Sequence, residues 1–335
     1  MIRHLLILLI LLTLKSQAQQ LGFSMNVQVS SPAVEFSKLQ DEWVVDHHGT
    51  YAYAAGRLTS WLDFNGLWQF GVSKRADYLF QFSTQTAQFY SRLEHNQLPP
   101  GKYTLDLQVS GLLSQGVFAR RIFSLGPKGQ LGVTLYGLQG SVVQLGTLTG
   151  EGEVFQDNSF QYEYELDYYF DHSRILDSPE VSVSGYGYAL DLDLEYNLGR
   201  HWALKGIIRD MSYQMYWSQI NRDKGCVARP TSALCSGKTT IGSNKQRIQR
   251  QSDWMIYGLK GLWRPFVQWQ SWGRNQSWIA GVLIDKYSAG WGFEDEVVNF
   301  TYDSDRLQVK WAFDNITAHD AHHWQLTLGT VWPIF

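Results

Sequence analysis

Residues 160–170 read FQYEYELDYYF, in which every even-numbered residue is aromatic or aliphatic and the odd-numbered residues up to Asp167 are polar. The same alternation returns in residues 188–198, YALDLDLEYNL. Successive side chains of an extended strand point to opposite faces, so this period predicts β-strands with one apolar and one acidic face. Such strands suit a soluble sandwich, with the acids in bulk water, or a membrane barrel, with the acids in the lumen.

Alternating segments recur along most of the chain, for example in residues 21–29, 62–72, 78–90, 103–109 and 307–313. The sequence has no sustained helical periodicity, so the chain is predicted to be all-β. The apolar faces carry Tyr and Trp near the predicted strand ends and Leu or Val in the middle, whereas the buried face of a soluble sandwich would be mainly aliphatic. This distribution favours the barrel, because barrels carry aromatic girdles at both lipid interfaces.

The N-terminal residues, MIRHLLILLILLTLKSQAQQ, combine a basic start, an apolar run and small residues at Ser16 and Ala18. The apolar run is shorter than the roughly 20 residues of a transmembrane helix. Residues 1–18 are therefore predicted to be a secretory signal peptide that is cleaved before Gln19.

The last residues, HHWQLTLGTVWPIF, alternate again, and the chain ends on Phe335. A signal peptide together with an amphipathic final strand and a terminal aromatic residue resembles the outer-membrane β-barrel proteins of Gram-negative bacteria. The resemblance implies a location in the outer membrane, with the N- and C-termini periplasmic and an even number of strands. It also implies contact with outer-membrane lipid and lipopolysaccharide, and recognition of the strand ending at Phe335 by the barrel-assembly machinery.

The composition is compatible with this class. Aromatic residues make up 15% of the sequence, with 14 Trp, 18 Tyr and 17 Phe, as expected of aromatic girdles. The mean hydropathy of −0.25 would suit a soluble protein, but half of each barrel strand also faces water. Residues 1–18 contribute two basic and no acidic side chains, so their removal changes the net charge from −3 to −5 and argues against a nucleic-acid partner.

The spacing of the segments predicts a transmembrane antiparallel up-and-down β-barrel of about 14 strands (about 12–16) over residues 60–335. An even count requires residues 254–272 to form one strand that bulges near Pro265, and residues 131–148 to form another long strand. Residues 19–59 are predicted to be an N-terminal strand followed by a loop, an extra strand pair or a segment in the lumen. A short turn is also expected at residues 73–76.

One hairpin can be aligned by its charges. Pairing residues 188–196 with residues 202–210 around Gly199 sets Tyr196 opposite Trp202 and Asp193 opposite Lys205. A shift by one residue would place Lys205 against an apolar side chain, so the alternation determines the face on which each residue lies.

If the apolar faces contact lipid, the charged faces line the lumen. The predicted lumen residues are Glu163, Glu165, Asp167, Asp191, Asp193, Glu195, Lys205, Arg209, Lys260 and Lys310. Opposed charges across a lumen create a transverse field that favours small hydrophilic molecules. The alternative is that these charges only neutralise one another and stabilise a filled barrel.

The two cysteines, Cys226 and Cys235, lie close together in a polar segment. In an oxidising envelope they are predicted to form one local disulfide. A metal site is not expected there, because zinc takes four ligands and no histidine flanks the pair.

The predicted function is a passive, porin-like channel or small-solute transporter without a cofactor or catalytic chemistry. One alternative is the outer-membrane component of a secretion system for a polysaccharide or a surface fibre. A second is an outer-membrane lipid hydrolase, since lipid A deacylases and phospholipases share the barrel architecture. Its candidate residues match no esterase or metalloprotease motif; they are His47, His48, His172, His201, His319, Asp320, His322 and His323.

Overall fold

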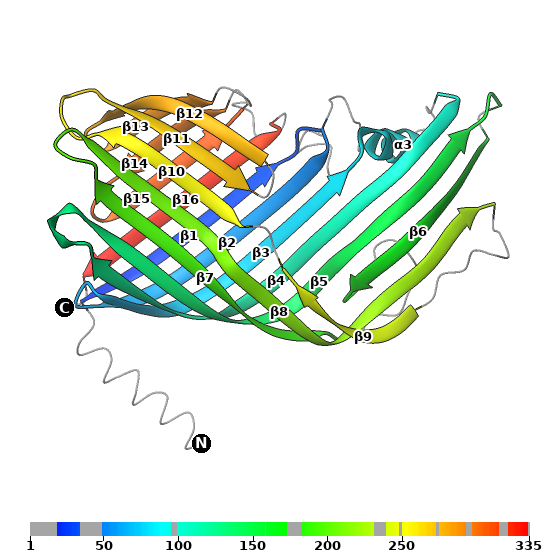
Figure 1. Cartoon of the computed structure of the whole chain (residues 1–335), viewed down its shortest axis with the longest axis horizontal. Helices are drawn as coiled ribbons and strands as arrows, with labels where there is room; N and C mark the ends of the chain where they lie inside the picture. The colour runs from blue at the N-terminus through cyan, green and yellow to red at the C-terminus, as the bar shows by residue number, and fades with distance from the viewer. Residues whose placement is uncertain are drawn as a thin grey trace, which may run out of the picture.

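The strands form one antiparallel sheet that closes on itself (Figure 1). The closure is made by β1 (Gln20–Ser30), which pairs with β2 (Tyr51–Phe64) on one side and with β16 (His323–Pro333) on the other. The computed structural model describes residues 19–33, 49–94, 99–157, 159–172, 182–230, 239–247, 250–272, 275–292, 297–314 and 321–333. In this part of the chain, no helix has the length and apolar character needed to cross a bilayer.

The remaining strands are β3 (Trp68–Phe82), β4 (Gly101–Ser124), β5 (Gly129–Val154), β6 (Phe160–Phe170), β7 (Ser184–Asn197), β8 (Trp202–Arg229), β9 (Thr239–Gln246), β10 (Gln251–Gly258), β11 (Arg264–Trp272), β12 (Asn275–Ile284), β13 (Tyr287–Gly292), β14 (Val298–Asp303) and β15 (Leu307–Phe313). β6 and β7 lie end to end between β5 and β8, and β9 and β10 follow one another along the other side of β8. The strands of the described ranges therefore occupy fourteen positions around the ring. The prediction of an all-β antiparallel barrel of about 14 strands is confirmed.

The two sides of the barrel differ in strand length. β4, β5 and β8 have 24, 26 and 28 residues, whereas β13, β14 and β15 have 6, 6 and 7. We call β3–β9 the long wall and β10–β16 the short wall. The ends of the long strands extend beyond the closed ring as a projecting sheet, formed by β6, β9 and the adjoining ends of β4, β5 and β8 (Figure 1).

The outer face of the ring is apolar. Val72 and Val117, which pair across β3 and β4, are 57% and 64% exposed, and Trp278 on β12 is 45% exposed. Polar side chains such as Asn26 and Gln325 are buried on the opposite face of their strands. An apolar outer face and a polar inner face are the arrangement of a barrel in lipid.

A bulge in β5, opposite Leu113 and Ser114 of β4, exchanges the two faces of that strand. Before the bulge, Tyr136 faces the lumen beside Phe118; beyond it, Leu148 faces outward beside Leu107. The apolar row of residues 160–170 pairs with this second half of β5 and therefore lies on the outer face. The acids of the same strand lie on the inner face, as the alternation predicts.

Part of the inner face of the long wall is packed like a soluble core. Leu112, Val143, Met215, Trp217 and Ile220, at most 2% exposed, are the centre of what we call the inner apolar cluster. Gly140 permits this packing, because a Cβ atom there would lie 2.4 Å from the Trp217 ring.

The helix α3 (Thr84–Glu94) follows β3 and covers the free edge of β4. β3 ends at Phe82, opposite Leu107, and leaves the preceding residues of β4 without a strand partner on that side. The backbone N–H of Asp106 donates to Thr86 Oγ1 at 2.7 Å, and that of Thr104 donates to Gln85 Oε1 at 2.8 Å. The helix start thus replaces the missing strand as acceptor.

Three expectations about the wall are wrong. Residues 254–272 form the hairpin β10–β11 instead of one bulged strand, because residues 259–263 make a turn. Residues 73–76 lie inside β3 and form no turn. The barrel includes β1 and starts β2 at Tyr51, so the boundary at residue 60 is misplaced. The long strand expected over residues 131–148 is confirmed as part of β5.

The hairpin between β7 and β8 has a different register from the one expected. Tyr196 lies opposite Leu204, and Lys205 lies opposite Glu195 instead of Asp193. The turn is tight, since the N–H of Leu198 donates to the carbonyl of Trp202 at 2.9 Å. The pairing differs by an even number of residues, so each side chain keeps the face that the alternation assigned to it.

Candidate functional site

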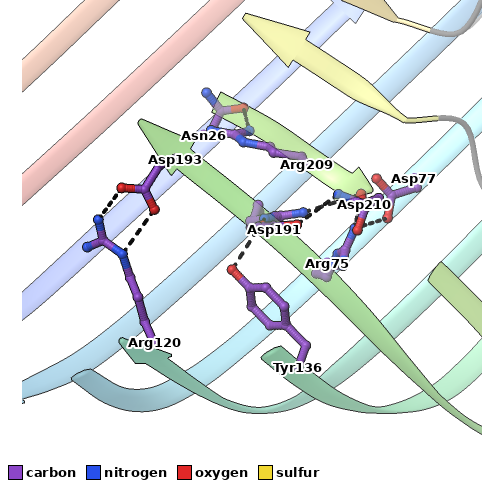
Figure 2. Close-up of polar contacts among 10 residues, drawn as sticks. Asn26, Arg75, Asp77, Arg120, Tyr136, Asp191, Asp193, Arg209 and Asp210 are labelled. Carbon is purple, nitrogen blue, oxygen red and sulfur yellow. Dashed lines mark hydrogen bonds and ion pairs between the residues drawn. The ribbon is translucent and has the colours of Figure 1, made fainter. Parts of the chain in front are cut away.

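Charged side chains meet inside the barrel near the middle of its height. We call Arg57, Arg75, Asp77, Asp191 and Asp210 the charge cluster; Figure 2 shows Arg75, Asp77 and Asp210 pointing toward one another. Arg57 and Arg75 lie directly opposite each other on β2 and β3. Like charges in that position repel, so the pair requires acids from elsewhere in the fold.

Two of those acids, Asp191 and Asp210, come from other strands, and Asp77 comes from β3 itself. Arg75 Nη2 lies 2.6 Å from Asp210 Oδ2, and both side chains are 1% exposed. Arg57 is bonded to Asp191 and lies 3.4 Å from Asp210. Asp77 adds a contact of 3.7 Å to Arg75. Because a buried ion is costly without a partner, each of these charges depends on the others.

The ion pairs cross the lumen. Arg57 and Arg75 are on β2 and β3, whereas Asp191 and Asp210 are on β7 and β8, four to five positions further round a ring of fourteen. Strands so far apart do not touch through their backbones, so the side chains must reach across the interior. The charge cluster therefore holds the two sides of the lumen together.

A bulge in β8 makes this contact possible. Asp210 has a φ of +54°, and the register between β7 and β8 shifts at this point. The bulge turns two consecutive side chains inward: Asp210 into the cluster, and Arg209 toward Asn26 on β1, 3.4 Å away. The N–H of Asp210 donates to Asp191 Oδ1 at 2.8 Å, which fixes the second acid.

Aromatic rings enclose the cluster. The guanidinium of Arg75 lies 5.8 Å from the centre of the Tyr136 ring and 5.3 Å from that of Tyr213. Such contacts favour a cation and exclude water. The inner apolar cluster contains both tyrosines, so it packs directly against the ion pairs.

A second contact closes the lumen between β2 and β11. The rings of Tyr53 and Trp272 stack with centroids 4.0 Å apart. Their strands are seven positions apart in a ring of fourteen, which is the largest separation available. The described lumen is thus bridged both by charges and by aromatic rings.

Polar cavities lie on both sides of these bridges. We call the rim where β1 begins and β16 ends the terminal rim, and the opposite one the distal rim. The cavity toward the terminal rim has a volume of about 390 Å³ and is lined by Gln69, Arg120, Gln130, Asp193 and Lys205, among others. The distal cavity is smaller, about 90 Å³, and is lined by Gln28, Ser30, Gln251, Gln270 and Gln325, among others.

One ion pair lies along the wall instead of across the lumen. Arg120 on β4 binds both carboxylate oxygens of Asp193 on β7, at 3.1 and 2.5 Å (Figure 2). β5 runs between these strands, and Gly132 leaves room for the pair, since a Cβ atom there would lie 2.2 Å from Asp193 Oδ2. Arg120 and Asp193 are 26% and 30% exposed and face the larger cavity.

Most of the predicted lumen residues lie on the inner face, as their strand pairings show: Asp191, Asp193, Glu195, Lys205, Arg209 and Lys310. Lys310 lies 3.8 Å from Asp253, and Glu195 accepts a hydrogen bond from the Tyr257 hydroxyl at 3.2 Å. Lys260 does not line the lumen: it is exposed in the turn between β10 and β11, because that segment is a hairpin.

The acids of β6 need a different correction. Glu163, Glu165 and Asp167 share the inner face, but they lie on the projecting sheet, beyond the closed ring. Glu163 and Glu165 are exposed, and Asp167 pairs with Arg222 at 2.8 and 2.7 Å. Their surroundings are therefore those of a solvated sheet and not of a narrow pore.

The alternation pattern does not single out Arg57, Arg75, Asp77 or Asp210 as lumen residues. The turn expected at residues 73–76 conceals Arg75 and Asp77, although Ser73, Arg75 and Asp77 alternate with Val72, Ala76 and Tyr78. Asp210 is out of phase with Arg209, and no alternation rule selects it, because the bulge that turns it inward is a tertiary feature.

The remaining predicted features are described in part. Cys226 lies on β8, whereas Cys235 is outside the described residues, so the disulfide stays a prediction. The same holds for residues 1–18, His47, His48, His319, Asp320 and Phe335. The His322 ring nitrogen lies 3.0 Å from the Ser31 carbonyl oxygen. Among the described residues, no group of three or more His, Cys, Asp or Glu side chains could hold a metal.

A closed antiparallel ring of fourteen positions, apolar outside and polar inside, defines an outer-membrane β-barrel of the Gram-negative type. No protein-family model and no curated protein matches the sequence. Among solved structures, the P. putida toluene transporter TodX is similar over 96% of this chain and 91% of its own, with 11% identity and a TM-score of 0.41. A Pseudomonas aeruginosa FadL homologue is similar over 95% and 91%, with 10% identity and a TM-score of 0.29.

Proposed function

We propose that this barrel is a channel for small hydrophilic solutes whose lumen is held closed by the charge cluster. The observation that carries the proposal is the set of ion pairs between β2–β3 and β7–β8. Solutes would pass between the two polar cavities only when these pairs separate. In this proposal the termini, and so the terminal rim, lie in the periplasm, and the even number of strand positions is compatible with it.

The arrangement of charge supports a polar cargo. When the pairs separate, Arg57, Arg75 and Asp77 remain on one side of the constriction with a net charge of +1, and Asp191, Asp210 and Arg209 remain on the other with a net charge of −1. This produces a transverse field that orients water and dipolar solutes. The amides and hydroxyls of the distal cavity offer such solutes donors and acceptors on the way in.

Conductance in planar bilayers tests the gate. The double variant Arg57→Gln/Asp191→Asn removes one cross-lumen pair and leaves no lone buried charge, because Arg75 stays paired with Asp210. The new amide oxygen at position 191 can still accept from the Asp210 N–H. We expect the open-channel frequency to rise by about tenfold, the effect of roughly 1.4 kcal/mol on a closed–open equilibrium. The matched control is Arg120→Gln/Asp193→Asn, which removes the same charges from a pair that lies along the wall. Equal effects of the two double variants would contradict the gate.

Charge reversal tests the selectivity. Replacing Asp191 and Asp193 by lysine is expected to move ion selectivity toward anions, because both acids face the larger cavity. Reversal potentials measured in a salt gradient report this shift. An unchanged reversal potential would show that these acids do not line the conducting path.

A channel for small apolar compounds is the second candidate. The inner apolar cluster favours it, because opening the packing around the buried Leu112, Met215 and Trp217 would expose an apolar path along the inner face of the long wall. Uptake by proteoliposomes separates the candidates: a channel for polar solutes admits small sugars or amino acids, and a channel for apolar compounds admits toluene in preference. Secretion of a polymer gains no support, since the described lumen is bridged at two places.

A further inference from the structure

The outer surface of the long wall carries an apolar groove near the distal rim. Six residues characterise it: Phe80, Leu107, Leu148, Tyr162 and Tyr164 from four neighbouring strands, and Phe89 from α3. Its volume is about 570 Å³, which is larger than that of either lumen cavity. The groove lies outside the lumen and plays no part in the channel proposed above.

Strand register places the groove on the lipid side. Phe80 is on the same face of β3 as Val72, and β3 pairs with β2 and β4 without a register shift. Leu107 lies opposite Phe82, and Leu148 lies opposite both Leu107 and Leu166. The face that is exposed to lipid at Val72 therefore continues into the groove.

The helix α3 forms one side of the groove. Phe89, which is 5% exposed, packs on the outer face of β5 at Gly152, where a Cβ atom would lie 2.5 Å from the Phe89 ring. Phe89 also contacts Tyr103, with ring centroids 5.4 Å apart. Because Gly152 has no side chain, the helix approaches the sheet closely. The helix then forms one side of the groove, and the aromatic surface of the strands forms its floor.

The groove is at the height of one membrane leaflet. From Phe70 to Phe82 the outer face of β3 spans roughly 28 Å across a bilayer, at about 3.3 Å per residue and a tilt of about 45°. This is about the height of the apolar band of a barrel. Phe80 and Phe82 are at the distal end of that span, which is the outer leaflet if the terminal rim is periplasmic.

A cation stands beyond the aromatic end of the groove. The rings of Tyr164, Tyr162 and Phe160 stack in sequence, with centroids 5.7 and 6.4 Å apart. The exposed guanidinium of Arg229 lies 4.6 Å from the Phe160 ring centre. The apolar groove thus runs along the outer wall and ends close to the positive charge of Arg229, near the membrane surface.

We propose that the groove holds an acyl chain of an outer-leaflet lipid, with the lipid phosphate at Arg229. The continuity of the groove with the lipid-facing wall selects a lipid, because acyl chains already cover that surface. The position of Arg229 selects an anionic headgroup, since arginine binds phosphate with two parallel donors. The lipid would hold α3 and the projecting sheet at the membrane surface.

Native mass spectrometry of the purified barrel with dipalmitoyl phosphatidylglycerol tests the proposal. We expect one retained lipid per barrel. Leu148→Trp, which fills the groove, is expected to lower retention by about tenfold, and Arg229→Gln by about threefold. Arg229 is exposed, so the second variant keeps the fold even if the first does not.

Val267→Trp on β11 is the matched control, because it adds the same ring to an exposed, lipid-facing position of the short wall. It is expected to retain lipid as the unchanged protein does. Equal retention by Leu148→Trp and Val267→Trp would overturn the proposal. So would a groove that binds dodecane without a headgroup but retains no phosphatidylglycerol. Neither result depends on conductance, so the channel proposal is tested separately.

Discussion

The long wall and the short wall both separate lipid from the lumen, but different kinds of contact stabilise their inner faces. On the short wall the inner face is a network of amides: Gln268 and Gln270 donate to Asp253 at 2.6 and 3.1 Å, and Asn299 donates to Gln268 at 3.4 Å. On the long wall the inner face combines fully buried charges with the inner apolar cluster. The polar groups of the short wall are mainly amides around the partly exposed Asp253, whereas those of the long wall include fully buried ion pairs.

This difference indicates which contacts hold the lumen closed and which contacts can persist when the lumen opens. Neutral amides bonded within one wall keep their partners when the lumen changes width. The ion pairs Arg75–Asp210 and Lys310–Asp253 do not, because their strands are four and five positions apart. The long wall therefore holds the fully buried contacts that a transport cycle must break, and the short wall adds a pair in which Asp253 is 37% exposed.

The largest expected effect is on the free energy of unfolding, when a buried acid of the long wall is compared with a partly exposed acid of the short wall. Asp210→Asn leaves Arg75 buried with one acid fewer, and we expect the free energy of unfolding to fall by about 3–5 kcal/mol. Asp253→Asn on the short wall, at a side chain that is 37% exposed, should cost about 1 kcal/mol or less. Urea unfolding in detergent micelles, followed by the heat-dependent gel shift of the folded barrel, measures both. Similar losses would remove the distinction between the walls.

The next effect compares two tryptophans. Trp217→Leu leaves a cavity in the inner apolar cluster and is expected to cost about 2–3 kcal/mol of unfolding free energy. Trp278→Leu on the short wall, which is 45% exposed toward lipid, should cost less than about 1 kcal/mol, since an aliphatic side chain also suits that surface. The same unfolding assay applies. A larger loss at Trp278 would mean that the girdle, and not the interior, stabilises the barrel.

A smaller effect concerns a lysine on the lipid-facing side of the long wall. Lys74 lies on the same face of β3 as Val72 and is exposed. Lys74→Leu is expected to raise the free energy of unfolding by about 1–2 kcal/mol, because a cation costs most near the bilayer midplane. Lys245→Leu, on β9 of the projecting sheet, is the control and should change stability little. A loss of stability in Lys74→Leu would place that side chain outside the hydrocarbon.

The smallest effect is expected on the projecting sheet. Glu165→Gln should leave ion selectivity unchanged and alter stability by less than about 0.5 kcal/mol, since Glu165 is exposed beyond the closed ring. Reversal potentials measured beside those of Asp193→Asn give the comparison. A shift at Glu165 as large as that at Asp193 would extend the conducting path along the projecting sheet.

The alternation of residues 160–170 and 188–198 correctly assigned the inner and outer faces of β6 and β7, because a strand has no other way to separate its side chains. The same rule would have found Arg75 and Asp77 if residues 73–76 had been kept within a strand. It failed at Lys260, where a tight turn divides an apolar stretch. It could not find Asp210, whose side chain turns inward through a bulge.

The sequence by itself determined the class of fold and the face of most side chains, because period and composition are local properties of a strand in lipid. Only the tertiary structure decided which charges meet. Asp191 and Asp210, the acids that Arg57 and Arg75 bind across the lumen, are more than 100 residues away in the chain. Their encounter with the arginines depends on ring closure, on the β8 bulge and on the width of the lumen. The same is true of the outer groove, where α3 meets β5 at a glycine that the alternation pattern does not distinguish from any other.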